Sequence, residues 1–444
     1  MQARTKALIA TSLTLALAAC GDAAKLPEQA SVGAKSELPA PNHTLIPTVD
    51  IPAAKGWPQG AKPKPADGLE VKAFATGLNH PRWLHVLPNG EVLVAETNAP
   101  QRPDEGRGIK GWVYQMAQKR AGAGVPSANR ITLLRDEDGD GTAETKTEFL
   151  QGLNSPFGMA IIGQDFYVAN TDAVMRFPYA EGQTHIAAPG AKVADLPAGP
   201  LNHHWTKSLI ASRDGSRLYA TVGSNSNAAE NGIDKEERRA LILEIDPANG
   251  QSRIFAFGLR NPNGMAWQPE TGALWTVVNE RDELGSDLVP DYLTEVKRDA
   301  FYGWPYSYWG QNVDKRVSPQ RPELVEKAIV PDYALGNHVA PLGLAFSAGN
   351  LLPEKYRNGA FIGEHGSWNR KPISGYKVVF VPFANGRPSG LPVDVLTGFL
   401  SDKEEGLGRP VGVAIERSGA LLVADDVGNT IWRVAPAEPK SAMR

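Results

Sequence analysis

Cysteine is almost absent from this chain, which has one in 444 residues. A single cysteine excludes an intramolecular disulfide, a cysteine-rich zinc site and an attached c-type haem. An excess of charge of one sign is also missing, since 46 Lys and Arg stand against 49 Asp and Glu. The resulting net charge of −3 carries no electrostatic signature of nucleic-acid binding.

Long hydrophobic runs are lacking as well, so no segment is expected to cross a membrane. Glycine and proline are plentiful, with 45 and 35 residues, which disfavours long helices and favours many turns. Hydrophobic residues make up 42% of the chain, enough for a sizeable core. The composition therefore indicates a folded, turn-rich protein of one large domain or two to three average ones.

The single cysteine lies at the end of a short apolar run. Arg4 and Lys6 precede this run, which continues to Ala19, and the sequence Leu-Ala-Ala-Cys-Gly around Cys20 resembles a bacterial lipobox. We predict that residues 1–19 are a lipoprotein signal peptide and that Cys20 carries the lipid. An ordinary secretory peptide is the alternative. In the lipoprotein case the chain is anchored in the periplasm or cell envelope by lipid alone.

Residues 20–67 are rich in proline and poor in large apolar side chains. This composition predicts an extended, flexible tether. Residues 437–444 are expected to form a C-terminal tail.

One short sequence motif, which we call the proline phrase, recurs from residue 70 onward. It contains an apolar residue, Gly-Leu-Asn or a close variant, and proline, and a strand-like run follows it. Clear copies reach their proline at Pro81, Pro156, Pro262 and Pro410, and weaker copies lie at 202–221 and 337–363. The mean spacing of about 66 residues exceeds the roughly 40–45 of a compact four-stranded blade and leaves room for long loops.

Six repeats of one sheet each predict an all-β fold, a six-bladed β-propeller over residues 68–436, because radial closure protects the sheet edges. A large β-sandwich is the alternative. Equivalent turns of a propeller converge on one end of the central channel. We therefore expect one pocket to collect side chains from different repeats, among them His204, Arg260, Asn261, Arg409 and Asp425.

Histidine is the usual general base near neutral pH, and arginine binds carboxylates through two parallel bonds. The acidic loop 279–287, followed by Asp291, suits Ca²⁺ or is a solvated surface loop. Residues 136–141 resemble the start of an EF-hand loop, but Thr147 stands at the twelfth position, so a hairpin turn is favoured there. Whether Asp136 to Asp140 bind Ca²⁺ stays open.

An aromatic stretch at 301–309 is suited to stacking on a planar ligand or sugar, or to packing of a loop. The segment 364–370 contains too many polar residues for a buried strand end. No P-loop, Gly-x-Ser-x-Gly elbow or dinucleotide fingerprint occurs, which disfavours a Rossmann-type nicotinamide enzyme.

These motifs together resemble the sorbosone dehydrogenase family, relatives of the soluble quinoprotein glucose dehydrogenase and the aldose sugar dehydrogenases. The resemblance covers roughly residues 68–435. It rests on Asn202-His203-His204-Trp205, Gly258-Leu259-Arg260-Asn261-Pro262, Asn279-Glu280-Arg281-Asp282-Glu283, Phe301-Tyr302-Gly303-Trp304-Pro305 and Glu364-His365-Gly366-Ser367-Trp368. It implies a six-bladed propeller that binds pyrroloquinoline quinone (PQQ) and Ca²⁺.

The resemblance also implies roles for single residues. His204 would be the catalytic base, and the expected cofactor contacts are Arg260, Asn261, Arg409 and Asp425. Backbone carbonyls at Glu280 and Arg281 would meet the Ca²⁺, and further metal candidates are Asp287, Asp291 and Tyr302.

Three positions depart from the glucose enzyme. His203 stands in place of an acid, so different substrate recognition is expected. Leu153 replaces a polar cofactor contact, which leaves Asn154 as its substitute. Arg370 or Lys371 would serve for a lysine that meets the quinone.

The leading hypothesis is a PQQ-dependent dehydrogenase of aldoses or sugar aldehydes that passes electrons to a quinone or cytochrome. A Ca²⁺-dependent lactonase-type propeller is the second hypothesis. A non-catalytic envelope lipoprotein that binds carbohydrate or protein is the third.

Overall fold

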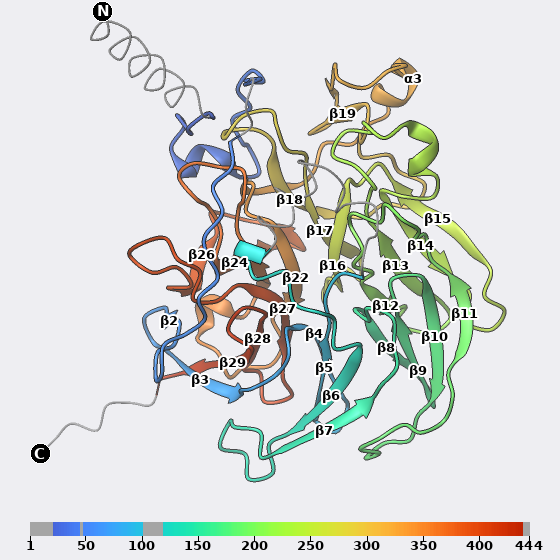
Figure 1. Ribbon diagram of the computed structural model, residues 1–444, viewed down its shortest axis with the longest axis vertical. Helices are drawn as coiled ribbons and strands as arrows, with labels where there is room; N and C mark the ends of the chain where they lie inside the picture. The colour runs from blue at the N-terminus through green and yellow to red at the C-terminus, as the bar shows by residue number, and fades with distance from the viewer. Residues whose placement is uncertain (1–20, 45–47, 101–118, 438–444) are drawn as a thin grey trace, which may run out of the picture.

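Strands account for nearly all regular secondary structure in the part of the chain that the structure describes, residues 21–44, 48–100 and 119–437. In this computed structural model they form a ring of sheets around one centre, a six-bladed β-propeller (Figure 1). The predicted fold class is thus confirmed. Cys20, the predicted signal peptide and residues 438–444 lie outside the described residues.

Each blade is a sheet of antiparallel strands that mostly follow one another along the chain. The first three blades are β4 (Pro81–Val86), β5 (Val92–Glu96), β6 (Arg130–Arg135) and β7 (Thr145–Leu150); β8 (Met159–Ile162), β9 (Asp165–Ala169), β10 (Ala173–Pro178) and β11 (Ala191–Asp195); and β12 (Leu209–Ala211), β13 (Leu218–Val222), β14 (Leu241–Ile245) and β15 (Ser252–Phe257). The last three are β16 (Asn261–Trp267), β17 (Leu274–Asn279), β18 (Pro290–Glu295) and β21 (Tyr333–Asn337); β22 (Pro341–Phe346), β23 (Gly359–Glu364), β24 (Lys377–Ala384) and β26 (Val393–Thr397); and β27 (Pro410–Ile415), β28 (Leu421–Asp425), β29 (Thr430–Pro436) and β3 (Leu69–Ala75).

Several short elements are added to the four main strands of the blades or lie outside these strands. They are β1 (Val32–Gly33), β2 (Lys64–Pro65), β19 (Ser307–Tyr308), β20 (Asn312–Val313), β25 (Arg387–Pro388), α3 (Pro322–Val325) and the 3₁₀ turns η1 (Glu28–Ser31), η2 (Ile233–Glu236) and η3 (Glu354–Tyr356). None of the helices in the described ranges has the length and hydropathy that a membrane span requires.

The ring closes through its last blade. Strand β3 comes from the start of the propeller sequence but pairs with β29 near its end, so the two ends of the domain share one sheet. This pairing removes the free edge that a linear array of sheets would leave.

In four of the six blades, a proline of the recurring proline phrase lies at or beside the start of the innermost strand. Strands β4, β16, β22 and β27 begin at or beside Pro81, Pro262, Pro341 and Pro410, and each shows a register irregularity just after the proline. Strands β4, β8, β12, β16, β22 and β27 contact one another in a closed ring. The ring is tight: a Cβ at Gly343 would lie 2.4 Å from the carbonyl oxygen of Val411, so only glycine fits there.

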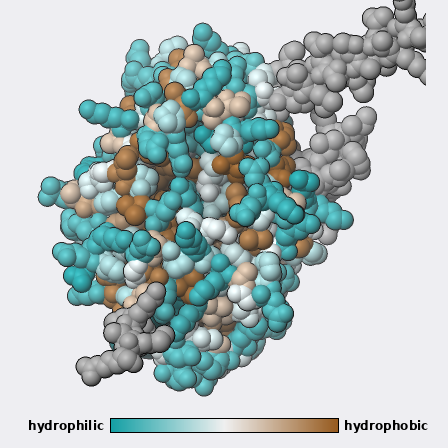
Figure 2. Space-filling view, turned by 90° about the vertical axis from the view of Figure 1, so that its left-hand side faces the viewer, coloured by the Kyte–Doolittle hydropathy of each residue, from teal (hydrophilic) through white to brown (hydrophobic). Residues whose placement is uncertain are grey.

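The segment expected to be a flexible tether instead packs along the propeller over its described residues. Strand β1 adds to β21 and β2 adds to β26. Between them the Trp57 ring packs edge-on against Phe399 and Trp432. Backbone pairing and an aromatic anchor thus compensate for the low apolar content from which flexibility was predicted. Hydrophilic side chains cover most of the face in Figure 2, with hydrophobic ones in smaller patches between them.

Candidate active site

A polar cavity of about 200 Å³ lies where residues from four blades meet. Its walls come from segments that precede an inner strand, such as Arg260, or follow a second strand, such as Asp282 and His365. The residues around it are His204, Arg260, Asn261, Asn279, Glu280, Asp282, Asp291, His338, Ala340, His365, Gly366, Trp368, Asn369 and Arg409.

The structure therefore brings together a large part of the predicted site. The predicted residues that line this cavity are His204, Arg260, Asn261, Arg409, Glu280 and Asp291. They lie far apart in sequence, and the equivalence of blade turns is what unites them.

His204 has one ring nitrogen fixed by the protein. Its Nδ1 lies 2.8 Å from the backbone oxygen of Ser224, and since a carbonyl only accepts hydrogen bonds, Nδ1 is the protonated nitrogen. The other nitrogen, Nε2, then carries the lone pair. Burial and the charge of Arg260 hold the pKa of His204 well below its usual value, so the ring is a neutral base near pH 7.

Arg260 holds the acidic loop in place. Its Nη1 donates to the backbone oxygen of Glu280 at 2.6 Å, and its Nη2 donates to Asp282 at 3.2 Å. Further bonds go to the backbone of Asn279 and to both oxygens of Asn227, so all five N–H groups of the guanidinium are engaged. Arg260 thus acts first as a scaffold of the cavity wall.

His338, which the sequence did not single out, lies buried near two carboxyl groups, those of Asp282 and Asp291. Its Nδ1 lies 3.5 Å from Asp282, and its Nε2 lies 3.0 Å from the backbone oxygen of Gly285. Burial opposes protonation, but the bond to Asp282 and the charges of Asp282 and Asp291 raise the pKa of His338. Burial raises the pKa of Asp291 to about 7.

Three buried acceptor oxygens on the cavity wall have no hydrogen-bond partner among the described residues. They are Oε1 of Glu280, Oδ1 of Asn261 and Oδ1 of Asn369. A buried acceptor without a partner is costly, and a hard cation such as Ca²⁺ takes carboxylate and amide oxygens as ligands. These oxygens are of the chemical type that such a cation takes as ligands.

Arg409, which precedes the inner strand of the last blade, places a cation on the cavity wall. Its Nε donates to the backbone oxygen of His365 at 3.0 Å, and its Nη2 donates to that of Gly366 at 3.3 Å. No described residue bonds its Nη1, so part of the guanidinium is open to an anionic group.

The remaining predicted residues have other surroundings. Asp425 accepts bonds from the indoles of Trp57 and Trp432, and Asp287 accepts from the backbone of Lys25 and Leu26. Both carboxylates therefore hold chain segments together outside the cavity wall.

Arg281 points into a buried network with Glu280 and Asp314, so its side chain is a structural cation. The Tyr302 hydroxyl donates to the backbone of Glu295. The Arg370 guanidinium donates to the backbone of Ser286.

Exposed Asn154 bonds Asp172, and His203 is half-buried beside His204 without lining the cavity. Asp136, Asp138, Asp140 and Glu144 place carboxylate oxygens within 4.8 Å of one another on the exposed hairpin between β6 and β7.

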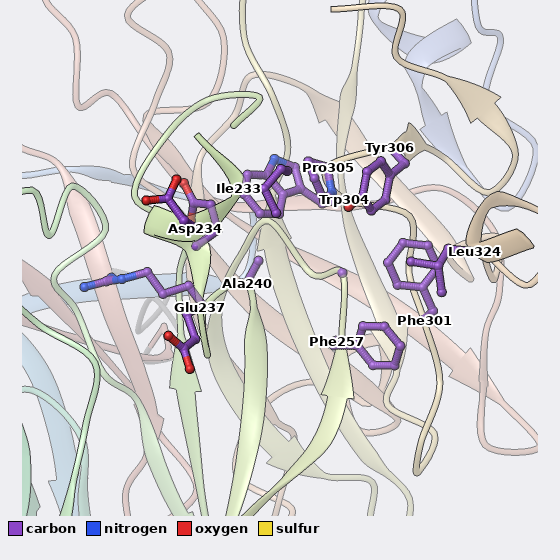
Figure 3. Close-up of a pocket in the computed structure, with 13 residues that line it drawn as sticks. Ile233, Asp234, Glu237, Ala240, Phe257, Phe301, Trp304, Pro305, Tyr306 and Leu324 are labelled. Carbon is purple, nitrogen blue, oxygen red and sulfur yellow. The ribbon is translucent and has the colours of Figure 1, made fainter. Parts of the chain in front are cut away.

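The aromatic stretch at 301–309 lines a different pocket, of about 460 Å³ (Figure 3). Phe257, Phe301 and Tyr306 lie on one side of it, and Asp234 and Glu237 lie on the other. Trp304 is only 3% exposed and donates to the backbone of Asn227. Loop packing, one of the two readings of this stretch, is the role that its burial supports.

Sequence reasoning also missed Lys207, a fully buried lysine beside the candidate base. Its Nζ donates to the backbone oxygens of His204 at 3.4 Å and Trp205 at 3.2 Å. Burial and Arg239 hold its pKa well below the usual value. His338, His365 and Lys207 share one signal that was available: each is within four residues of an inner-strand start or a second-strand end.

The fold and cavity define a propeller with a polar site at one end of its channel. The sequence matches the TrAA12-like family over residues 63–300 and 322–437, and the chain belongs to that family. A match to the sorbosone dehydrogenases in particular is not among these findings.

Two curated relatives of the chain, one with a named activity and one uncharacterised, are between 24% and 32% identical to it. The chain is 24% identical to a pyrroloquinoline quinone-dependent pyranose dehydrogenase of Coprinopsis cinerea, over 83% of this chain and 54% of that protein. It is 32% identical to an uncharacterised protein of Borreliella burgdorferi, over 54% of this chain and 62% of that protein. The chain thus spans between half and two thirds of the length of these curated relatives.

Solved structures share the fold. The holo pyranose dehydrogenase PQQ domain from Coprinopsis cinerea superposes with a TM-score of 0.67 at 19% identity, covering 87% of this chain and 100% of that one. The soluble aldose sugar dehydrogenase of Escherichia coli, in its apo form, gives 0.58 at 16% identity, covering 83% of this chain and 100% of that one.

Proposed function

We propose that this protein is a PQQ- and Ca²⁺-dependent dehydrogenase that oxidises an aldose or a sugar aldehyde such as sorbosone. The single observation that carries the proposal is one cavity lined by His204, whose Nε2 no described residue bonds, and by three residues that each have an unpartnered oxygen. The named activities of the pyranose and aldose sugar dehydrogenases support the same reaction class.

The cavity residues have different roles in the proposed reaction. Glu280, Asn261 and Asn369 would hold the cation through their open oxygens, and Arg409 would meet a cofactor carboxylate through Nη1. PQQ, when bound, supplies the acceptor for the hydride that leaves the substrate carbon. His204 takes the hydroxyl proton at Nε2, while its Nδ1–H bond to Ser224 holds the ring in the basic tautomer.

The proposal is tested by adding PQQ to the purified protein with Ca²⁺ or with EDTA. Binding is followed by absorbance, and a panel of sugars is then added with a dye acceptor. We expect Ca²⁺-dependent binding and reduction of the bound quinone by at least one sugar. Absence of PQQ binding under both conditions contradicts the proposal.

A hydrolase that uses the same cation is a second candidate. The observation in its favour is that Arg260 has no N–H group to spare for a cofactor carboxylate, whereas the open oxygens need only a cation. Hydrolysis of lactones by the Ca²⁺-loaded, PQQ-free protein, without dye reduction, would favour this candidate.

Attachment of a lipid at Cys20, and with it a place in the cell envelope, stays a prediction from residues 1–20. Metabolic labelling with a fatty-acid analogue tests it directly. Label in the wild-type protein and none in Cys20→Ser is the expected result, and equal label in both contradicts it.

A further inference from the structure

His365 is a cavity residue whose ring is tightly oriented by the protein. It follows β23, and its backbone nitrogen donates to the carbonyl of Ala340 at 3.0 Å. Its own carbonyl accepts Nε of Arg409 at 3.0 Å. At the far end of the ring, Nε2 lies 2.9 Å from Oδ2 of Asp426.

Asp426 decides which ring nitrogen of His365 carries the proton. Its Oδ2 also accepts Nη1 of Arg82 at 2.6 Å, and His80 lies 3.6 Å away. Although burial alone would raise it, the pKa of Asp426 is lowered, and the permanently charged Arg82 guanidinium at 2.6 Å keeps the carboxylate ionised. An ionised carboxylate only accepts, so Nε2 of His365 is the N–H and Nδ1 keeps the lone pair.

His365 stays neutral in this setting. Burial and the charge of Arg409 lower its pKa to about 3, against the opposing charge of Asp426. The other charged side chain on this cluster is Arg82, which packs 5.7 Å from the ring of Trp205. An unprotonated Nδ1 is therefore present across the neutral range.

The three histidines of the cavity differ in what they leave open. His338 has a partner at each ring nitrogen. His204 and His365 each have one nitrogen bound to a fixed acceptor, and no described residue bonds the other. If His204 is the base, the second open acceptor has no role in the chemistry and is free to bind the substrate.

Trp368 lies three residues further along the same loop and also lines the cavity. Trp368 is 42% exposed, whereas most tryptophans of the described chain are buried. Its backbone oxygen accepts the amide of Asp50 at 2.8 Å, which fixes the loop. An exposed aromatic residue at a polar cavity suits the C–H face of a sugar ring.

We propose that His365 and Trp368 form the sugar-binding subsite of this cavity. Nδ1 of His365 accepts a hydrogen bond from one hydroxyl group of the substrate, and the ring of Trp368 packs against its C–H face. This inference rests on the proposed function in one respect, namely that the substrate is a sugar. Asp426 and Arg82 act as positioning residues for His365.

A matched pair of variants separates the two nitrogens of His365. In His365→Gln the amide reaches the place of Nε2 and keeps the donor to Asp426, but the Nδ1 acceptor is lost. In His365→Asn the amide oxygen lies near the place of Nδ1, and the donor to Asp426 is lost instead. We expect His365→Gln to raise KM roughly tenfold with little change in kcat, as loss of one hydrogen bond predicts. His365→Asn should recover part of the loss.

Monodeoxy sugars identify the hydroxyl group. For the sugar that lacks it, wild type and His365→Gln should have the same KM, while for all others they should differ. Trp368→Ala should raise KM for every sugar in the panel. Equal KM values for wild type and His365→Gln with every sugar would overturn the subsite.

A readout without turnover uses ¹⁵N-histidine NMR of the cofactor-free protein, with the His365 signals assigned through His365→Gln. Addition of the sugar should shift Nδ1 and leave Nε2 nearly unchanged. Failure of PQQ binding in the wild type defeats the proposed function, but the NMR titration still tests the subsite. An unmoved Nδ1 signal at saturating sugar overturns it.

Discussion

Replacement of Asp425 by asparagine tests whether this residue is a structural anchor or a cofactor contact. Oδ2 of Asp425 accepts Nε1 of Trp57 at 2.7 Å and Nε1 of Trp432 at 3.0 Å. Oδ1 accepts the backbone amides of Arg409 at 2.8 Å and Gly428 at 2.7 Å. An asparagine offers one acceptor oxygen, so its NH₂ group must face one of these donor pairs in either orientation.

Two of the four hydrogen bonds to Asp425 are therefore lost, and two buried N–H groups meet a donor. A hydrogen bond to a charged group contributes about 1.5–3 kcal/mol. Burial raises the pKa of Asp425 to about 6, which offsets part of this contribution because the neutral asparagine has no charge to desolvate. Asp425→Asn should therefore lower the free energy of unfolding at pH 7 by about 1–3 kcal/mol. Urea unfolding followed by circular dichroism measures this change. The m-value should stay constant, because the surface exposed on unfolding is unchanged.

Trp57→Phe serves as the matched variant, since it removes one donor and leaves an aromatic ring against Phe399. If the asparagine NH₂ faces the indoles, Trp57→Phe costs less in the Asp425→Asn background than in the wild type. The structural role is refuted if Asp425→Asn unfolds at the wild-type midpoint but binds PQQ more weakly. That outcome would restore the cofactor contact expected from the sequence.

Three further predictions concern the cavity and the buried bases beside it. His204→Asn keeps the donor to Ser224 but lacks the base, so kcat should fall roughly 10²- to 10⁴-fold with PQQ affinity unchanged. Burial lowers the pKa of His80 to about 4. Between pH 6.5 and 4 this histidine is therefore protonated in the unfolded chain and neutral in the folded protein. Stability should therefore fall between pH 6.5 and 4 in urea titrations, and less so in His80→Gln. Lys207→Met removes a buried amine with a lowered pKa, so it should raise the melting temperature at pH 7 while lowering kcat.

The propeller could be predicted because its signal is local and repeated. A proline after Gly-Leu-Asn marks the bulge at which an inner strand begins, and the same steric need recurs in several blades. The spacing of these prolines after residue 68 therefore shows the length of the structural repeat. The pairing of β1 and β2 has no such signal, because two-residue strands depend on edges supplied by β21 and β26.

The site was predictable only in part for a related reason. His204, Arg260 and Arg409 come together because they lie on equivalent turns of different blades. This equivalence does not predict the hydrogen-bond partners of each side chain. Arg260 was expected to face a ligand, yet its donors are consumed by the loop that it supports. Hydrogen-bond saturation depends on partners from 19 to 33 residues away, which composition and spacing do not reveal.

Asp425 and Asp426 show how finely the structure divides such roles. Asp425 is the last residue of β28 and Asp426 is the first beyond it, and the two carboxylates have different partners. Asp425 holds Trp57 and Trp432, whereas Asp426 orients His365, which lines the cavity. The resemblance selected the first acid of the pair, whereas the contacts place the second against a histidine that lines the cavity. The first two residues beyond a second strand are thus the better place to search: Glu280 after β17 and His365 after β23 are the first such residues, and Ser224 after β13 is the second.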